Sequence, residues 1–190
     1  MSDHAAKGLN LEDILKQLEG KKHPPVERWN PDFCGDIDMR IASDGTWFYM
    51  GTPITRDRMV RLFSTVLRKD EDGKTYLVTP VEKIGITVDD APFVATQMDH
   101  IQDGDKEAFK FTTNVGDEVI AGPDHPIRVE VNEETGEPRP YVHVRGRLEA
   151  LIARPVFYDL VERAALKEGA MIISSLGQEF SLGHVDMEDA

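Results

Sequence analysis

Residues 41–69 read IASDGTWFYMGTPITRDRMVRLFSTVLRK, and this stretch decides the fold of the first half of the chain. Its Asp44-Gly45 pair stands between two strand-like runs and predicts a β-hairpin, because the tight turn needs a positive φ that glycine adopts without steric cost. Just upstream, apolar and charged residues alternate over residues 37–41, which is typical of a half-buried strand. The stretch therefore predicts a strand, a turn, a second strand and then a helix.

The helix is expected to begin at the Gly-Thr-Pro break. Thr52 is a suitable N-cap with Pro53 at the first helical position, and Thr55 is an equally acceptable cap. Five apolar residues recur at helical spacing and form one core-facing side: Met59, Leu62, Phe63, Val66 and Leu67. Arg68 falls opposite that side and is expected to be solvated, whereas Arg56 projects beside it from the first turn.

Length and composition are those of an ordinary globular protein. The chain has 190 residues, of which 40% are hydrophobic and 30% charged, enough to bury a core without covalent staples. The single cysteine, Cys34, excludes an intramolecular disulfide and suggests a reducing compartment. No signal-like or membrane-length apolar run is present, so the sequence favours a cytoplasmic location and no membrane partner.

Charge is unevenly distributed along the chain. The net charge of -13 argues against a non-specific partner among nucleic acids or anionic membranes. Residues 89–137 hold thirteen acidic side chains against three basic ones, whereas residues 56–69 and 139–154 are two basic islands. A small anionic ligand is the partner that such islands favour in an acidic protein.

The segment pattern predicts an α+β chain of two related domains. Residues 1–25 are expected to form an N-terminal helix and linker, residues 26–92 an α+β domain, and residues 93–190 a second α+β domain. In the second half, short strands closed by a helix at residues 155–167 predict a curved antiparallel sheet or small barrel with one packed helix. The expected strands there are residues 93–101, 108–113, 118–121, 127–131, a long run at 141–153, and 170–174.

An internal echo supports a degenerate duplication. The pattern Pro-Ile-x-x-Asp at residues 53–57 recurs as Pro-Val-x-x-Asp at residues 155–159, a shift of 102 positions. In both places an apolar strand is expected before the pattern and a helix after it. If the two sites are equivalent, each half contains a similar strand-break-helix unit.

Short motifs spread over most of the chain give the family signal. They are Cys34-Gly35-Asp36-Ile37, Asp44-Gly45-x-Trp47, Gly51-x-Pro53-Ile54-x-Arg56, Leu77-Val78-Thr79-Pro80, Ala91-Pro92-Phe93, Tyr141-x-x-Val144-Arg145 and Arg154-x-Val156-x-Tyr158. Together they resemble the bacterial domain-of-unknown-function family 1285. The resemblance implies a duplicated core, a C-terminal domain superficially like a pleckstrin-homology fold, and a nucleotide-type ligand site between the domains with a role in signalling.

Arg56 is the first candidate for ligand binding. A cation in the first turn of a helix opposes the macrodipole, so it does not serve helix stability. With the free N-H groups of the helix start it could hold a phosphate or carboxylate, and Arg154 could do the same at the second helix. The alternative for Arg56 is an ion pair with Asp36 or Asp38.

Four further residues complete the candidate site. Arg145 and Arg147 alternate onto one face of the same expected strand, where the alternative is a solvated or ion-paired surface. Lys83 could contact the ligand or simply pair with Glu82 or another nearby acid. Trp47 could stack on a base, although core packing suits an aromatic residue in a hairpin strand better.

Signatures of catalysis and of metal binding are missing from the sequence. The six histidines are scattered, and no HExxH, GxxxxGK[ST] or GxSxG pattern occurs. We therefore expect no metal, no cofactor and no enzyme activity, with a hydrolase based on Asp36, Asp38 or Cys34 as the least favoured reading. The expected function is a non-enzymatic ligand-binding protein with a signalling role, and the alternative is a protein-protein interaction module.

Overall fold

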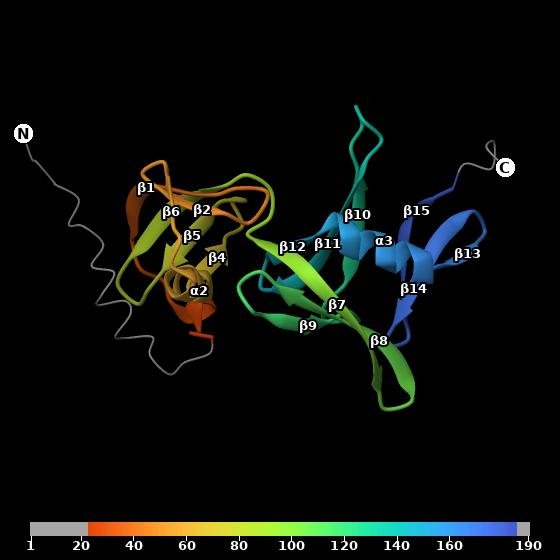
Figure 1. Cartoon of the computed structure of the whole chain (residues 1–190). Coiled ribbons are helices and arrows are strands. Elements are labelled where there is room, and N and C mark those ends of the chain that lie inside the picture. Colours follow the sequence, from red (N-terminus) through yellow and green to blue (C-terminus); the bar gives the residue numbers. More distant parts are fainter. Residues whose placement is uncertain (1–22, 186–190) are drawn as a thin grey trace, which may run out of the picture.

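Two six-stranded sheets follow one another along the chain, and a small three-stranded sheet completes it (Figure 1). The computed structural model describes residues 23–185. Within that range the protein is mostly β with two α-helices. Helices and strands are both present, as the predicted α+β class requires, but strands dominate. Most of residues 1–25, including the predicted N-terminal helix, lies outside the described residues.

The N-terminal unit forms the first sheet, whose strand order is β3-β2-β1-β6-β5-β4. Its elements are η1 Val26–Arg28, β1 Phe33–Ile41, β2 Trp47–Tyr49, β3 Thr52–Pro53, α2 Asp57–Thr65, β4 Leu67–Lys69, β5 Thr75–Val78 and β6 Lys83–Val88. The first and last long strands, β1 and β6, lie side by side at the centre and run parallel. All other pairs in this sheet are antiparallel.

The predicted hairpin at Asp44-Gly45 is confirmed. Strands β1 and β2 pair antiparallel with Ile41 opposite Trp47. Gly45 adopts a φ of 88°, and the Asp44 carboxylate accepts a hydrogen bond of 2.9 Å from the backbone N-H of Thr46. That hydrogen bond lowers the pKa of Asp44 below its usual value.

The helix start differs from the prediction. Thr52–Pro53 form β3, which pairs with β2, and α2 begins only at Asp57 with Arg56 at the N-cap and no side-chain cap. The tight turn between β2 and β3 carries positive φ at Met50 and Gly51 and folds the chain back onto β2. Neither Thr52 nor Thr55 therefore caps the helix, and Arg56 occupies the N-cap position.

Arg68 is buried, so the prediction that it is solvated was wrong. The helix ends at Thr65, and the chain continues into β4, where the helical spacing that placed Arg68 outside no longer applies. Its side chain is 9% exposed and donates hydrogen bonds to the carbonyl oxygens of Val26 (2.8 Å) and Trp29 (2.7 Å). Arg68 thereby fastens the η1 segment to the first sheet.

The C-terminal unit forms the second sheet, in the order β10-β11-β12-β7-β8-β9, with the third sheet beyond it. Its elements are β7 Phe93–Asp103, β8 Lys106–Thr113, β9 Glu118–Ile120, β10 Ile127–Val131, β11 Pro138–Arg145, β12 Leu148–Ile152, α3 Arg154–Arg163, β13 Ala165–Lys167, β14 Ala170–Ser175 and β15 Gln178–His184. The β7 and β12 strands are parallel neighbours at the centre.

Three details of this half differ from the prediction. The long run at residues 141–153 is a hairpin of β11 and β12, because the chain turns at Gly146 with a φ of 53°. Helix α3 ends at Arg163 instead of residue 167, because Ala165–Lys167 pairs with β14. Strand β15 was not predicted at all.

The duplication lies in the sheets and not in the sequence echo. In each half, the first and sixth strands are central and parallel, the second and third flank the first, and the fifth and fourth flank the sixth. However, α2 lies between the third and fourth strands of its half, whereas α3 follows the sixth. Residues 53–57 and 155–159 are therefore not equivalent positions, and their similarity does not mark the repeat.

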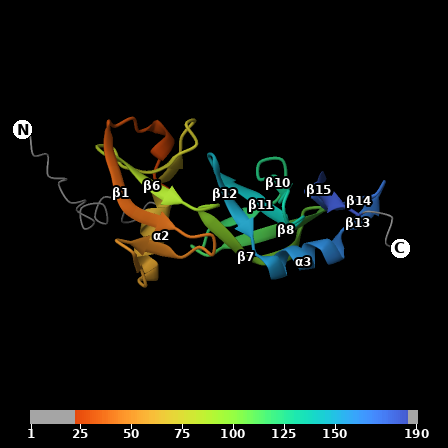
Figure 2. The same ribbon diagram turned by 90° about the horizontal axis from the view of Figure 1, so that it is seen from above.

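One continuous hydrophobic cluster runs through both units. Large side chains that are fully buried include Trp47 and Phe63 of the first unit and Phe93 and Phe111 of the second. Helix α3 packs against β7 and β14, and both views place the β13–β15 sheet at the end of the molecule far from β1 (Figures 1 and 2). Among the helices of residues 23–185, none has the length and apolar character needed to cross a bilayer.

Candidate functional site

A cleft of about 440 Å³ lies where the hairpin turn of the N-terminal unit meets the C-terminal unit. Its volume is in the range of small-molecule sites. It is bounded by the β1–β2 turn, the segment between the two units, the start of β11, the end of β12 and the first turns of α3. Its polar and aromatic lining residues are Ser43, Asp44, Asp90, Glu137, Arg139, Arg154, Phe157 and Tyr158.

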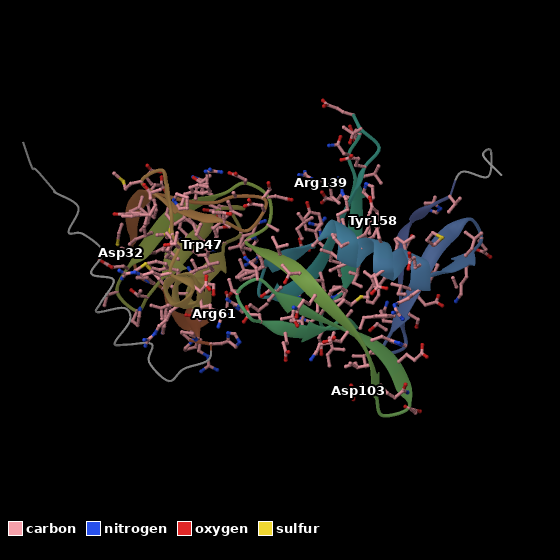
Figure 3. All side chains as sticks on the ribbon, in the orientation of Figure 1. Asp32, Trp47, Arg61, Asp103, Arg139 and Tyr158 are labelled. Atoms are coloured by element: carbon pink, nitrogen blue, oxygen red, sulfur yellow. The ribbon has the colours of Figure 1, made fainter. Side chains whose placement is uncertain are left out.

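Two arginines of this cleft have hydrogen-bond donors to spare. Arg139 lies 3.6 Å from the Asp90 carboxylate and Arg154 lies 3.7 Å from the Glu137 carboxylate, both beyond hydrogen-bond range. The Arg154 side chain is 68% exposed. Figure 3 shows Arg139 and Tyr158 on the same side of the C-terminal unit, near the start of α3. Both guanidinium groups are thus available to an anionic group that enters the cleft.

The start of α3 adds an electrostatic contribution to the cleft. Ala153 is the N-cap and offers no side-chain oxygen to the first turn. The N-H groups of a first turn have no partner inside the helix, and together with the macrodipole they favour an anion. Because Arg154 begins this helix, a cationic side chain and free backbone donors occur at the same place.

Asp90 lines the same cleft and has an unusual environment. Its Oδ1 accepts a hydrogen bond of 2.7 Å from the hydroxyl of Tyr141, whereas its Oδ2 is buried without a hydrogen-bond partner in the described structure. Burial raises the pKa of the Tyr141 hydroxyl, and the hydrogen bond to Asp90 raises it further. The cleft therefore contains an acceptor as well as two cations.

Of the predicted site residues, only Arg154 lines this cleft. Arg56 is exposed at the start of α2 and is absent from the cleft lining. Neither Asp36 nor Asp38 makes an ion pair with Arg56 in the described part of the chain. Because α2 and α3 occupy different places in their repeats, Arg56 and Arg154 are not two copies of one anion site.

Arg145 and Arg147 do not share a strand face. Strand β11 ends at Arg145, and Arg147 follows in the turn before β12. The Arg145 guanidinium reaches Asp117 at 2.7 Å and the backbone carbonyl of Ser64 at 2.5 Å, whereas Arg147 reaches Glu71 at 3.1 Å. Arg145 and Arg147 instead contact the N-terminal unit at separate points.

Lys83 and Trp47 have structural surroundings. The Lys83 ammonium lies 2.8 Å from Asp70 and 4.3 Å from the centre of the Tyr76 ring, so a nearby acid other than Glu82 is its partner. Trp47 lies inside the first unit (Figure 3). Its side chain is 1% exposed and stacks on Phe63. For Lys83 the structure shows the alternative of an ion pair, and for Trp47 the alternative of core packing.

Sequence reasoning did not select Asp90 or Arg139. Arg139 belongs to the basic island at residues 139–154, and that charge pattern was the available signal for it. Asp90 stood just before the predicted boundary between the domains and carried no signal, because its contact with Tyr141 joins residues 51 positions apart. Both become visible only when the turn between the units is placed beside β11.

Metal-binding and nucleophilic side chains do not gather into a site in the described part of the chain. No set of three or more His, Cys, Asp or Glu side chains within residues 23–185 is arranged to hold a metal ion. Cys34 is exposed, and its thiol lies 3.2 Å from the backbone carbonyl of Asp32. The hydrogen-bond partner of the Cys34 thiol is therefore a backbone carbonyl and not a base that could activate a nucleophile.

The shared strand order of the halves defines a two-domain protein built by duplication of a six-stranded sheet. The chain belongs to the DUF1285 family. Residues 24–91 match the N-terminal domain model, described as a domain of unknown function, and residues 92–182 match the C-terminal domain model, described as a protein of unknown function.

Two solved structures are similar to this chain. A DUF1285 family protein from Silicibacter pomeroyi DSS-3 is 52% identical, with a TM-score of 0.85 over 92% of this chain and 95% of that one. A DUF1285 family protein from Shewanella baltica OS155 is 23% identical, with a TM-score of 0.53 over 67% of this chain and 92% of that one, which shows the fold alone. A search of curated proteins found no significant match.

Proposed function

We propose that this protein is a non-enzymatic ligand-binding protein with a signalling role, which holds a small anionic, nucleotide-type ligand in the cleft between its two domains. The observation that carries the proposal is the presence of Arg139 and Arg154 in one cleft of about 440 Å³, each with its nearest acid beyond hydrogen-bond range. Guanidinium groups bind phosphate and carboxylate through paired hydrogen bonds, so both are suited to this ligand class.

The remaining lining residues suit a nucleotide. Tyr158 presents a largely exposed aromatic ring on α3, and such rings stack on bases. Ser43 and Asp44 come from the N-terminal domain, so a ligand in the cleft contacts both domains at once. A ligand that contacts both domains can change their relative stability or orientation, which is the physical basis we propose for signalling.

The pleckstrin-like character of the C-terminal domain is part of the same proposal. A curved sheet followed by a helix, β7 to β12 and then α3, supports it. The parallel pairing of β7 with β12 and the added β13–β15 sheet are not part of the predicted curved antiparallel sheet with one helix. A cytoplasmic location, with no membrane or non-specific nucleic-acid partner, remains a prediction from Cys34 and the negative charge.

Thermal unfolding with a panel of nucleoside monophosphates tests the proposal. A ligand that binds only the folded state raises Tm, by an amount set by its concentration relative to Kd. We expect at least one nucleotide to raise Tm in the wild type and this rise to be lost in Arg154→Ala. Arg163→Ala, at the other end of α3 and paired with Asp159, is the matched control and should keep the response.

The outcome that contradicts the proposal is equally definite. If no nucleotide in the panel raises Tm, or if Arg154→Ala responds as the wild type does, the cleft is not the binding site. A response to inorganic phosphate of the same size would show that the nucleoside part contributes nothing.

A protein-protein interaction module is the second candidate, favoured by one surface. The hairpin joining β10 to β11 projects from the body (Figure 1), and Val131 at its base is 59% exposed beside Glu130, Glu133 and Glu134. An exposed apolar residue framed by acids suits a basic partner. Loss of a partner on Val131→Ser, but not on Arg154→Ala, would favour this function over ligand binding.

A further inference from the structure

We infer that Asp90 selects ligands that carry a hydrogen-bond donor, so that the occupant of the cleft is bipolar, with an anionic group at Arg139 and Arg154 and an N-H or O-H group at Asp90. This inference rests on the proposed function, because it concerns the same cleft. It adds a selectivity element that the two arginines alone do not supply.

The acceptor is Oδ2 of Asp90. This oxygen is buried and has no hydrogen-bond partner in the described structure, and the side chain as a whole is only 12% exposed. Buried carboxylate oxygens in native proteins are almost always hydrogen-bonded, since burial removes the water that would otherwise satisfy them. A donor supplied by a bound molecule would provide the missing hydrogen bond.

The Asp90 carboxylate is held in place before any ligand arrives. The Tyr141 hydroxyl occupies Oδ1 at 2.7 Å. The Tyr141 ring is covered by the guanidinium of Arg128 at 4.4 Å, and Arg128 is fixed by a paired hydrogen bond to Glu149. Oδ2 is therefore the carboxylate oxygen left without a hydrogen bond among the described residues. It is buried beside the half-exposed Arg139 side chain, so a ligand donor reaches it when that side chain moves toward the ligand anion.

Arg139 does not satisfy this oxygen. It lies 3.6 Å from Oδ2, an ion pair without a hydrogen bond, and its side chain is half exposed. A ligand anion that attracts Arg139 also meets the negative charge of Asp90, and that repulsion disfavours plain anions such as inorganic phosphate. A ligand that also carries a donor offsets the repulsion with a charge-assisted hydrogen bond.

Matched nucleotide pairs that differ by one amino group test the inference. Adenosine 5′-monophosphate is compared with purine riboside 5′-monophosphate, and guanosine 5′-monophosphate with inosine 5′-monophosphate, by calorimetric titration of the full chain. In at least one pair the amino-bearing member should bind about tenfold or more tightly, as expected for a hydrogen bond to a charged acceptor. Asp90→Asn should reduce this preference to about threefold or less and strengthen the binding of inorganic phosphate.

The neighbouring acid provides the control. Asp89 pairs with Arg40 on the surface and does not line the cleft, so Asp89→Asn should keep the wild-type preference. Equal binding within both pairs by the wild type, or a preference that survives Asp90→Asn, would overturn the role of Asp90 while cleft binding itself stands. If the wild type binds none of the four nucleotides, this inference and the proposed function both fail. Should Asp90→Asn not fold, equal binding within both pairs by the wild type would still overturn the inference.

Discussion

Arg145 of β11 donates a hydrogen bond of 2.5 Å to the backbone carbonyl of Ser64, in the last turn of α2. The carbonyl end of a helix carries a partial negative charge, so a cation there is stabilising. The other arm of the guanidinium pairs with Asp117 at 2.7 Å. This one side chain therefore joins the C-terminal domain to the helix of the N-terminal domain.

Removing this link should destabilise the fold. We expect Arg145→Ala to cost about 2–3 kcal/mol in urea unfolding, because the Asp117 carboxylate and the Ser64 carbonyl each lose a charge-assisted hydrogen bond. Arg145→Lys should recover only part of the loss, since one ammonium cannot reproduce the planar fork. Arg147→Ala, whose pair with Glu71 is exposed, should change stability by less than about 0.5 kcal/mol. Similar effects at both arginines would show that Arg145 is not the link described here.

The β1–β2 turn also depends on its contact with the second domain. Gly45 has a φ of 88°, and a Cβ there would lie 2.7 Å from Nδ2 of Asn114, which itself donates to the Gly45 carbonyl. Gly51 has a φ of 77° but open space around it. Both Gly→Ala variants should lose about 1–2 kcal/mol through the left-handed backbone, and Gly45→Ala should lose more. Equal losses in urea unfolding would mean that the Asn114 contact contributes nothing.

Asp70 should contribute to acid sensitivity. Burial by itself raises the pKa of this carboxyl, but hydrogen bonds from Arg68 and Lys83 outweigh it and lower the pKa below its usual value. A folded pKa below the unfolded one means that the unfolded state binds more protons in acid, so the stabilisation is present above the unfolded pKa and is lost as pH falls through the folded value.

We therefore expect the free energy of unfolding to fall as the pH is lowered from about 5 to 3. Asp70→Asn should be less stable than the wild type at neutral pH and show a shallower decline over this interval. The exposed Asp105, in the β7–β8 turn, provides the control variant Asp105→Asn. A decline that is unchanged in Asp70→Asn would exclude Asp70 as a source of acid sensitivity.

Ser175 connects the third sheet to the second. Its hydroxyl is fully buried, accepts a hydrogen bond of 2.9 Å from the Phe109 N-H and donates one of 2.7 Å to the Ala121 carbonyl. Ser175→Ala should cost about 1–3 kcal/mol by leaving those two groups unsatisfied. The adjacent Ser174→Ala is exposed and should be close to neutral in the same thermal or urea assay. If the two variants unfold alike, Ser175 does not fasten the third sheet.

Local patterns predicted those parts of the fold that depend on neighbouring residues. The Asp44-Gly45 hairpin and the alternation that buries Met39 and Ile41 are set by turn chemistry and by a period of two. The end of α2 was missed because Val66 and Leu67 continue the helical spacing of apolar residues, although the chain has already left the helix there. Arg68 was misplaced as a consequence. Strand β15 was missed because it is defined by its pairing with β14.

The cleft could be predicted only in part for the same reason. Arg154 was selected from its place before a helix, a local signal. Asp90 contacts Tyr141, 51 positions later, and Arg145 contacts Ser64, 81 positions earlier. Neither contact leaves a mark in the local sequence. The echo at residues 53–57 and 155–159 misled because the repeat is a strand order. Helix α2 falls within that order in the first half, whereas α3 comes after it in the second.

Backbone amide chemical-shift mapping with adenosine and guanosine 5′-monophosphates tests the central claim most directly, because it reports both binding and location. Our account predicts that the shifts concentrate on the lining of the interdomain cleft, at Asp44, Asp90, Ala153 and Tyr158. Absence of shifts with either nucleotide would contradict the account. So would shifts confined to either of two other polar pockets in the described structure, around Glu27 and Arg147 or around His125.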